Sequence, residues 1–143
     1  GVGVAPLLHL GKELKSRGIT PTFLLGGRSK EHLLRLESFE AVGKVYVTTE
    51  DASLGEKGFV TNHSLLIDSD NFDKIFACGP TPMLKAVAAW AKEHEIACEV
   101  SLEHKMACEI GACLCCVENT EEGNVCVCKE GPVFSIDKLL WNN

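Results

Sequence analysis

Four cysteines within nine residues, in the segment CEIGACLCC, are the part of this chain best suited to chemistry. Cys108, Cys113 and Cys116 are separated by four and then two residues, and Cys128 follows after eleven more. This spacing is typical of a plant-type [2Fe–2S] cluster, whose irons are held by four thiolates. The sequence therefore predicts an iron–sulfur cluster, and electron transfer as its chemistry, with no general acid or base among the residues.

The loop around these cysteines has the small residues that a cluster requires. Its backbone must turn toward the bridging sulfides, and Ala107, Gly111 and Ala112 leave room for that approach. Spacing alone leaves the fourth ligand open between Cys126 and Cys128, because residues two apart on a strand share one face.

Other uses of the thiols explain less of the pattern. A zinc site of four thiolates would combine two cysteines of the loop with two from the later pair, Cys113 and Cys116 with Cys126 and Cys128. It leaves Cys108 without a role and does not explain the small residues.

A disulfide framework is disfavoured because neighbouring thiols close loops too short to remove much chain entropy. Unused structural thiols are disfavoured because so many crowded cysteines are a chemical liability.

The rest of the chain predicts the elements that must position these groups. Strand-like apolar runs alternate with amphipathic helices, at residues 20–27, 44–51, 73–80 and 96–103 for strands and 4–17, 29–42 and 81–95 for helices. Such alternation is typical of an α/β fold with a mostly parallel sheet. We expect a nucleotide-binding α/β domain over residues 1–103 and a small cluster-binding module over residues 104–143, with Thr81 as the N-cap of the last helix.

Glycines at the start of the chain suggest a phosphate-binding turn. In GVGVAP, Gly1 and Gly3 could bring backbone N–H groups close to a phosphate, with Pro6 in place of the third glycine of the usual fingerprint. The motif is weak, and a plain turn that caps a helix explains it equally well. No strand precedes it, so we interpret the chain as a fragment that lacks the first strand of a nucleotide-binding fold.

Three loops should meet at the carboxyl edge of the sheet, where open α/β folds bind ligands. They cover residues 1–6, 26–29 and 78–82. Cys78, at the end of a buried strand, is placed to touch a cofactor there, although a small buried hydrophobic residue is an equally good interpretation.

Charge and hydropathy argue against several partners. Fourteen basic and twenty acidic residues give a net charge of −6 without a basic cluster, which disfavours nucleic acid and anionic membranes. No apolar run is long enough to span a membrane.

Without a secretory signal, so many thiols fit the reducing cytoplasm. The five histidines, including His104 beside the cysteine loop, are expected to be solvated side chains.

Five segments together resemble one family. They are GVGVAPLL, LGGRSKEHL, ACGPTPML, EVSLEHKMACEIGACLCCV and VCKEGPVF. The chain is similar over nearly its whole length to the electron-transfer subunits of NAD-dependent dihydroorotate dehydrogenases, in the ferredoxin-reductase superfamily. The resemblance implies a subunit of an oxidoreductase with FAD, one [2Fe–2S] cluster and an NAD site. It also implies a hetero-oligomer with an FMN-containing catalytic subunit that oxidises dihydroorotate in pyrimidine biosynthesis.

The resemblance also implies individual site residues. Because the family's last ligand precedes the stretch Gly-Pro-Val-Phe, the cluster ligands would be Cys108, Cys113, Cys116 and Cys128. The nucleotide would contact residues in four segments, namely Gly1, Gly3 and Pro6, then Gly27 and Arg28, then Asp51 and Gly55 of TEDASLGEKGFV, and Cys78, Gly79 and Pro80. The resemblance favours NAD over NADP, although Arg28 would suit a 2′-phosphate.

Two residues of the loop depart from the family's pattern. Glu109 stands where glycine is usual, so its side chain should strain the loop and its carboxylate should lower the cluster potential. Cys115 stands where a small residue is usual and offers an alternative ligand. The flavin-binding barrel that precedes this region in the family is absent from the chain, so we expect the fragment alone to be inactive.

Two rival functions use the same residues. One is the electron-transfer subunit of another flavin-dependent oxidoreductase, such as a ferredoxin–pyridine nucleotide reductase or a hydrogenase. The other, from a different class, is a zinc-stabilised binding module without redox activity.

Overall fold

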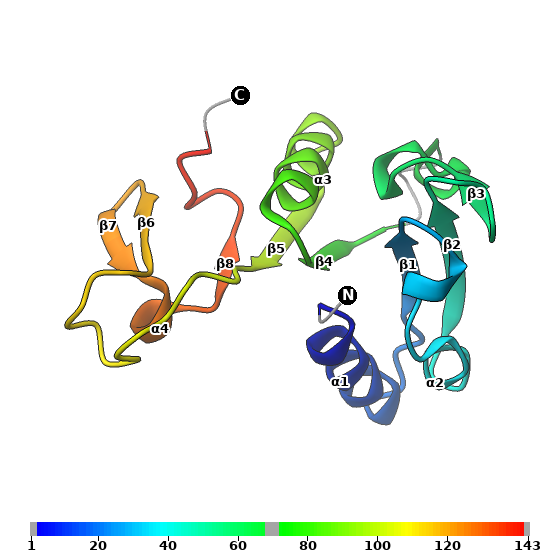
Figure 1. The fold of residues 1–143 in the computed structure, drawn as a ribbon, viewed down its shortest axis with the longest axis horizontal. Helices are drawn as coiled ribbons and strands as arrows, with labels where there is room; N and C mark the ends of the chain where they lie inside the picture. The colour runs from blue at the N-terminus through cyan, green and yellow to red at the C-terminus, as the bar shows by residue number, and fades with distance from the viewer. Residues whose placement is uncertain (1–2, 68–71, 142–143) are drawn as a thin grey trace. The chain divides into compact units, whose positions relative to one another are not determined.

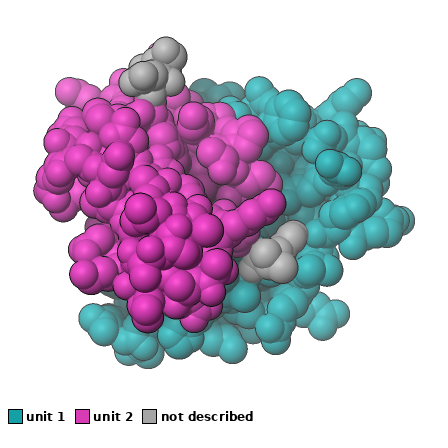
Figure 2. All heavy atoms as spheres, turned by 60° about the vertical axis from the view of Figure 1, so that its left-hand side comes forward, with its two compact units in different colours: residues 1–71 teal, residues 72–143 magenta. Residues whose placement is uncertain are grey.

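The computed structural model describes residues 3–67 and 72–141, and the chain forms two compact units, residues 1–71 and 72–143 (Figures 1 and 2). Within the described part, no helix is long and apolar enough to cross a membrane. Each unit contains parallel strands and helices, which confirms the predicted α/β class.

The first unit has a three-stranded parallel sheet. Its elements in chain order are α1 (Val4–Ser16), β1 (Thr22–Gly27), α2 (Leu36–Glu40), β2 (Lys44–Thr49) and β3 (Glu56–Lys57). β2 lies between β1 and β3 (Figure 1). One face of the sheet is buried against the helices, through a cluster made of Leu8, Phe23, Leu25, Phe39 and Val42. Alternate burial along β1 follows from the two-residue period of a strand.

The second predicted helix is shorter than the sequence indicated. The structure has a 3₁₀ turn at Lys30–His32, and α2 begins only at Leu36. Arg35, between them, has a left-handed backbone with φ of 61°, which interrupts a right-handed helix. The Ser29 hydroxyl lies 2.8 Å from His32 Nδ1 instead of capping a long helix.

The second unit combines a parallel pair with an antiparallel addition. It contains β4 (Lys74–Cys78), α3 (Thr81–Glu93), β5 (Ala97–Ser101), β6 (Val117–Thr120), β7 (Gly123–Cys126), α4 (Val127–Glu130) and β8 (Val133–Ser135). β5 pairs in parallel with β4 and antiparallel with β8, and β6 and β7 form a hairpin. The N-cap of α3 is Pro80, so Thr81 is its first residue and not its cap as predicted.

The core of the second unit runs from α3 into the cysteine-rich segment. Leu84 and Val100 belong to the same buried cluster as Cys116, Val127 and Ile136. The compact units therefore divide the chain near residue 71, because β8 pairs with β5 and draws the last forty residues into the core of α3 and β5. The domain boundary near residue 103 stays a prediction.

A substitution of Phe39 tests the hydrophobic core of the first unit. Its side chain is 0% exposed and meets the ring of Phe23 edge-on at 4.8 Å. Phe39→Ala should lower the free energy of unfolding of the natural full-length protein by about 3–5 kcal/mol, because it leaves a cavity. Urea denaturation measures the change.

Phe59, which is 64% exposed, is the matched control. Phe59→Ala should change stability by no more than about 0.5 kcal/mol. Equal losses from the two substitutions would contradict this assignment of the core.

Candidate metal centre and nucleotide-binding loops

The first predicted ligand, Cys108, is surrounded by backbone donors. The N–H groups of Ala112 and Cys113 both donate to its Sγ, at 3.3 Å. The loop turns back on itself through three left-handed residues, Glu109, Gly111 and Leu114, with φ of 57°, 78° and 58°. Because N–H donors stabilise negative sulfur, this geometry suits a thiolate.

Cys116 and Cys128 are joined across the module. The Cys128 N–H donates to Cys116 Sγ at 3.4 Å, and the Val127 N–H donates to the Cys116 carbonyl at 2.9 Å. The short helix α4 thereby carries the later cysteine to the earlier one. Cys116 is buried, so the connection lies at the edge of the core and not on a free loop.

Hydrogen bonding distinguishes two of the predicted ligands from the two spare thiols. Cys108 and Cys116 accept backbone N–H bonds, at 3.3 and 3.4 Å. Cys115 and Cys126 instead donate to carbonyl oxygens at 3.8 Å, Cys115 to that of Cys113 and Cys126 to that of Gly111. A thiol that donates its proton is not acting as a thiolate ligand.

The pKa values of two predicted ligands are lowered. The Cys115 backbone N–H, together with the Cys108 thiol, lowers the pKa of Cys113 to about 6. The Cys128 N–H lowers the pKa of Cys116. Burial raises the pKa of Cys126, and the hydrogen bond to Cys113 raises that of Cys115. The pKa of Cys128 is raised as well, by its contact with the Cys116 thiol.

The predicted ligands form two hydrogen-bonded pairs. The Cys113 N–H donates to Cys108 Sγ at 3.3 Å, and the Cys128 N–H donates to Cys116 Sγ at 3.4 Å. Two pairs of soft thiolates suit the two irons of a cluster. Over residues 3–67 and 72–141, no three or more His, Cys, Asp or Glu side chains converge into one group that could hold a metal ion. The assignment of the four ligands stays a prediction, which this geometry supports.

His104 is not the solvated side chain expected from the sequence. Its Nε2 lies 2.8 Å from the Glu118 carboxylate, which also accepts a bond from Trp141 Nε1 at 3.2 Å. The three residues tie the start of the cysteine loop to β6 and to the C-terminal segment. Sequence reasoning missed this cluster because its members lie far apart in the chain.

Part of the predicted nucleotide site comes together in the first unit. At the carboxyl ends of β1 and β2, the Glu50 N–H donates to the Gly27 carbonyl at 3.1 Å, and the Asp51 N–H to that of Arg28 at 3.2 Å. The Asp51 carboxylate accepts bonds from the hydroxyl and N–H of Ser53, at 2.6 and 3.0 Å, and these bonds lower its pKa. Gly27, Arg28 and Asp51 thus share one edge of the sheet, as expected.

The structure describes only part of the N-terminal segment GVGVAP. Gly3 is the N-cap of α1, and Pro6 lies in its first turn, where N–H groups have no partners within the helix. Gly1 lies outside the described residues. Its predicted role therefore stays a prediction.

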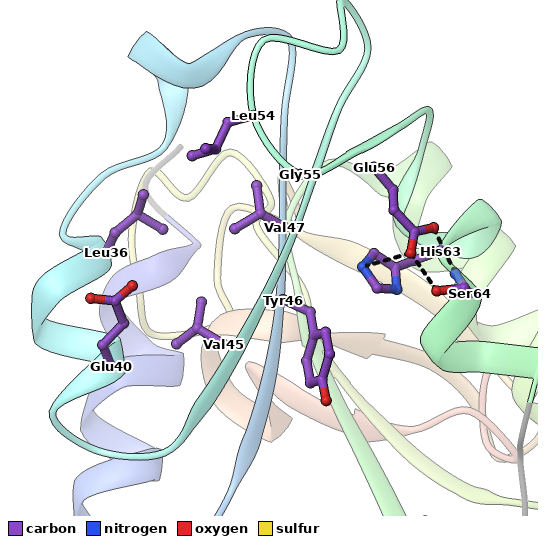
Figure 3. A pocket seen from close by; sticks show the side chains of 10 residues that line it. All are labelled: Leu36, Glu40, Val45, Tyr46, Val47, Leu54, Gly55, Glu56, His63 and Ser64. Atoms are coloured by element: carbon purple, nitrogen blue, oxygen red, sulfur yellow. Dashed lines mark hydrogen bonds and ion pairs between the residues drawn. The ribbon is translucent and has the colours of Figure 1, made fainter.

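Gly55 has a structural explanation. Its φ is 70°, and a Cβ atom there would lie 2.0 Å from the Val47 carbonyl oxygen. It lines a pocket of about 410 Å³ beside β2 that sequence reasoning did not predict (Figure 3). Three polar groups of that pocket pair with one another: Glu56 accepts from the Ser64 N–H at 2.9 Å and lies 3.6 Å from His63 Nε2. The glycine is thus required by close packing at the edge of β2.

The remaining predicted contacts lie in the second unit. Cys78 ends β4, and Gly79 and Pro80 lead into α3. The Cys78 Sγ lies 3.9 Å from a carboxylate oxygen of Glu103, which the sequence gave no reason to single out. Burial, and then the charge of Glu103, raise the pKa of Cys78, so the group is a neutral thiol. The predicted roles of Cys78, Gly79 and Pro80 in nucleotide binding stay predictions.

The module and the whole chain are similar to known proteins. Residues 103–140 match the family described as the iron–sulfur cluster binding domain of dihydroorotate dehydrogenase B. A probable dihydroorotate dehydrogenase B (NAD⁺) electron transfer subunit of Methanocaldococcus jannaschii is 45% identical over 143 residues, covering 99% of this chain and 54% of the relative. The corresponding subunit of Bacillus pumilus is 40% identical, covering 97% and 54%. The chain spans about half the length of these relatives.

A solved structure resembles the chain as well. It is that of an NADH-dependent reduced ferredoxin–NADP oxidoreductase, described in the context of flavin-based electron bifurcation. The TM-score is 0.85 with 32% identity, over 99% of this chain and 51% of the other.

Glu109 supplies a test of the cysteine loop. Its left-handed backbone favours glycine, so Glu109→Gly should stabilise the loop by up to about 1 kcal/mol. Glu109→Gln retains the strained Cβ and removes only the charge. Both variants should raise the reduction potential of the cluster, because each removes a carboxylate beside it, but only the glycine variant should retain the cluster longer during urea denaturation.

The potential is measured by spectroscopic redox titration of the full-length protein. A potential that is unchanged in both variants would contradict the electrostatic role of Glu109. Equal cluster retention in the two variants would contradict the strain.

Proposed function

We propose that this chain, which is similar over nearly its whole length to dihydroorotate dehydrogenase B electron transfer subunits, carries a [2Fe–2S] cluster and a pyridine nucleotide site and relays electrons between them through FAD. The observation that carries the proposal is the division of the thiols. Two sulfurs at the ferredoxin-type spacing, those of Cys108 and Cys116, accept N–H bonds, whereas the spare thiols Cys115 and Cys126 donate to carbonyl oxygens.

The residues of the chain would hold and tune the cofactors. Cys108, Cys113, Cys116 and Cys128 would hold the cluster, which supplies one-electron transfer when it is bound. N–H bonds to ligand sulfurs raise the reduction potential of a cluster by offsetting its negative charge. Burial excludes water that would otherwise screen that charge. The N–H donors of Ala112 and Cys128 would act in this sense, opposed by the Glu109 carboxylate.

The nucleotide would bind at the loops that follow the strands. The predicted contacts are Gly27, Arg28 and Asp51, then Cys78, Gly79 and Pro80, with further contacts from Gly1, Gly3, Pro6 and Gly55. Family relatives named for NAD favour NAD over NADP. FAD would be held mainly by a domain outside these 143 residues.

The partner would be an FMN-containing catalytic subunit that oxidises dihydroorotate in pyrimidine biosynthesis. Support comes from the relatives, which are named as electron transfer subunits. All eight cysteines are free thiols in the structure, which suits the reducing cytoplasm as the location.

Metal and sulfide analysis tests the proposed cluster. The anaerobically purified full-length protein should contain about two irons and two acid-labile sulfides per chain. Its visible absorption should bleach on addition of dithionite. One zinc without sulfide, and a colourless protein, would establish the zinc-stabilised module instead.

A ferredoxin–pyridine nucleotide oxidoreductase is a second candidate, favoured by the solved structure with a TM-score of 0.85. Deletion of the gene separates the two functions. The dihydroorotate reading predicts that a strain without a second dihydroorotate dehydrogenase fails to grow on pyrimidine-free medium and recovers with uracil. Unaffected growth would favour the ferredoxin-linked function.

A further inference from the structure

We propose that Cys126 is a reserve ligand of the cluster, able to take over the iron position of Cys128. The inference rests on the proposed [2Fe–2S] function and extends it to a residue that the ligand spacing leaves unused. It also distinguishes Cys126 from Cys115, the other spare thiol of the module.

Cys126 lies against the ligands on two sides. Its Sγ is 3.8 Å from the Gly111 carbonyl oxygen, in the middle of the loop that joins Cys108 to Cys113. Its side chain also packs against the buried cluster that contains Cys116. Cys128 packs against the same cluster, so both thiols approach Cys116 from one short segment of chain.

The position of Cys126 does not depend on the sulfur of Cys128. Cys126 is the last residue of β7 and pairs with Val117, the residue directly after Cys116. The next residue, Val127, is 0% exposed and donates its N–H to the Cys116 carbonyl at 2.9 Å. These backbone bonds hold Cys126 beside Cys116 even when the Cys128 side chain is lost.

The exchange of ligands conserves atoms and electrons. The iron–sulfur bond to Cys128 breaks, and that sulfur takes up a proton. Cys126 releases its thiol proton to solvent and forms the new bond to the same iron. Neither iron changes its oxidation state, and the donated bond to the Gly111 carbonyl is given up.

Cys115 does not have the same position. It is exposed, and its S–H donates to the Cys113 carbonyl within its own loop. Its neighbour Leu114 already has a left-handed backbone, and Cys116 follows it directly. Bringing Cys115 to the iron would require the turn that carries Cys113 and Cys116 to refold.

Alanine variants of the full-length protein test the proposal, because alanine cannot bind iron. After anaerobic purification, Cys128→Ala should retain about two irons and two sulfides, with altered visible absorption and electron paramagnetic resonance. Cys126→Ala/Cys128→Ala should lose cluster content on the order of tenfold. The matched control, Cys115→Ala/Cys128→Ala, should retain it, and Cys126→Ala alone should keep the spectra of the unmodified protein.

Loss of the cluster from Cys128→Ala would overturn the proposal, as would equal retention by the Cys126→Ala/Cys128→Ala variant. If an alanine variant does not fold by circular dichroism, Cys128→Val, which also cannot bind iron, and mass-spectrometric iodoacetamide labelling decide the question. The proposal predicts that Cys126 is labelled in the unmodified protein and protected in Cys128→Val, and labelling in both would overturn it. An unmodified protein without iron would instead remove the proposed function itself.

Discussion

The structure of the second unit depends on one buried residue, Cys116. Its side chain is 1% exposed and packs in the same cluster as Leu84 of α3 and Val100 of β5, while its sulfur accepts an N–H bond from Cys128. One residue is thus both a core side chain and a candidate ligand. A redox group held in this way is fixed against a rigid core, which keeps the reorganisation of its surroundings small when charge changes.

The loop beside this anchor is built against ordinary backbone preferences. Glu109 and Leu114 both adopt left-handed conformations, and each costs about 1–2 kcal/mol relative to a right-handed residue. Such strain persists only when the surroundings impose it, and it is concentrated at functional sites. Here the imposed turns aim the N–H groups of Ala112 and Cys113 at one sulfur, so the local cost and the ligand geometry have the same origin.

The sequence predicted features that depend on local pattern and missed those that depend on distant partners. α1 and the parallel strands were predictable because apolar periodicity and glycine stops act over a few residues. The spacing of the candidate ligands could be recognised because cluster geometry restricts it, and the ligand assignment stays a prediction.

The shortened α2, the Cys78–Glu103 contact and the His104–Glu118–Trp141 cluster were not predictable, since each follows from tertiary packing or from a single unusual φ. Spacing alone did not separate Cys126 from Cys128. The family resemblance favoured Cys128, and in the structure the Cys126 sulfur faces the Gly111 carbonyl.

The pairing of β8 with β5 has a consequence for how this protein can be recombined. Residues 133–135 complete a sheet whose other strands come from the α/β part, with Val133, Phe134 and Ser135 opposite Ser101, Val100 and Glu99. Separating the chain at residue 103 would leave β5 as an unpaired edge strand and leave β8 without a partner strand. The cysteine-rich segment therefore cannot be transferred by itself to another protein. A chimera would have to inherit β4, α3 and β5 with it, so exchange in evolution or in engineering should occur upstream of β4.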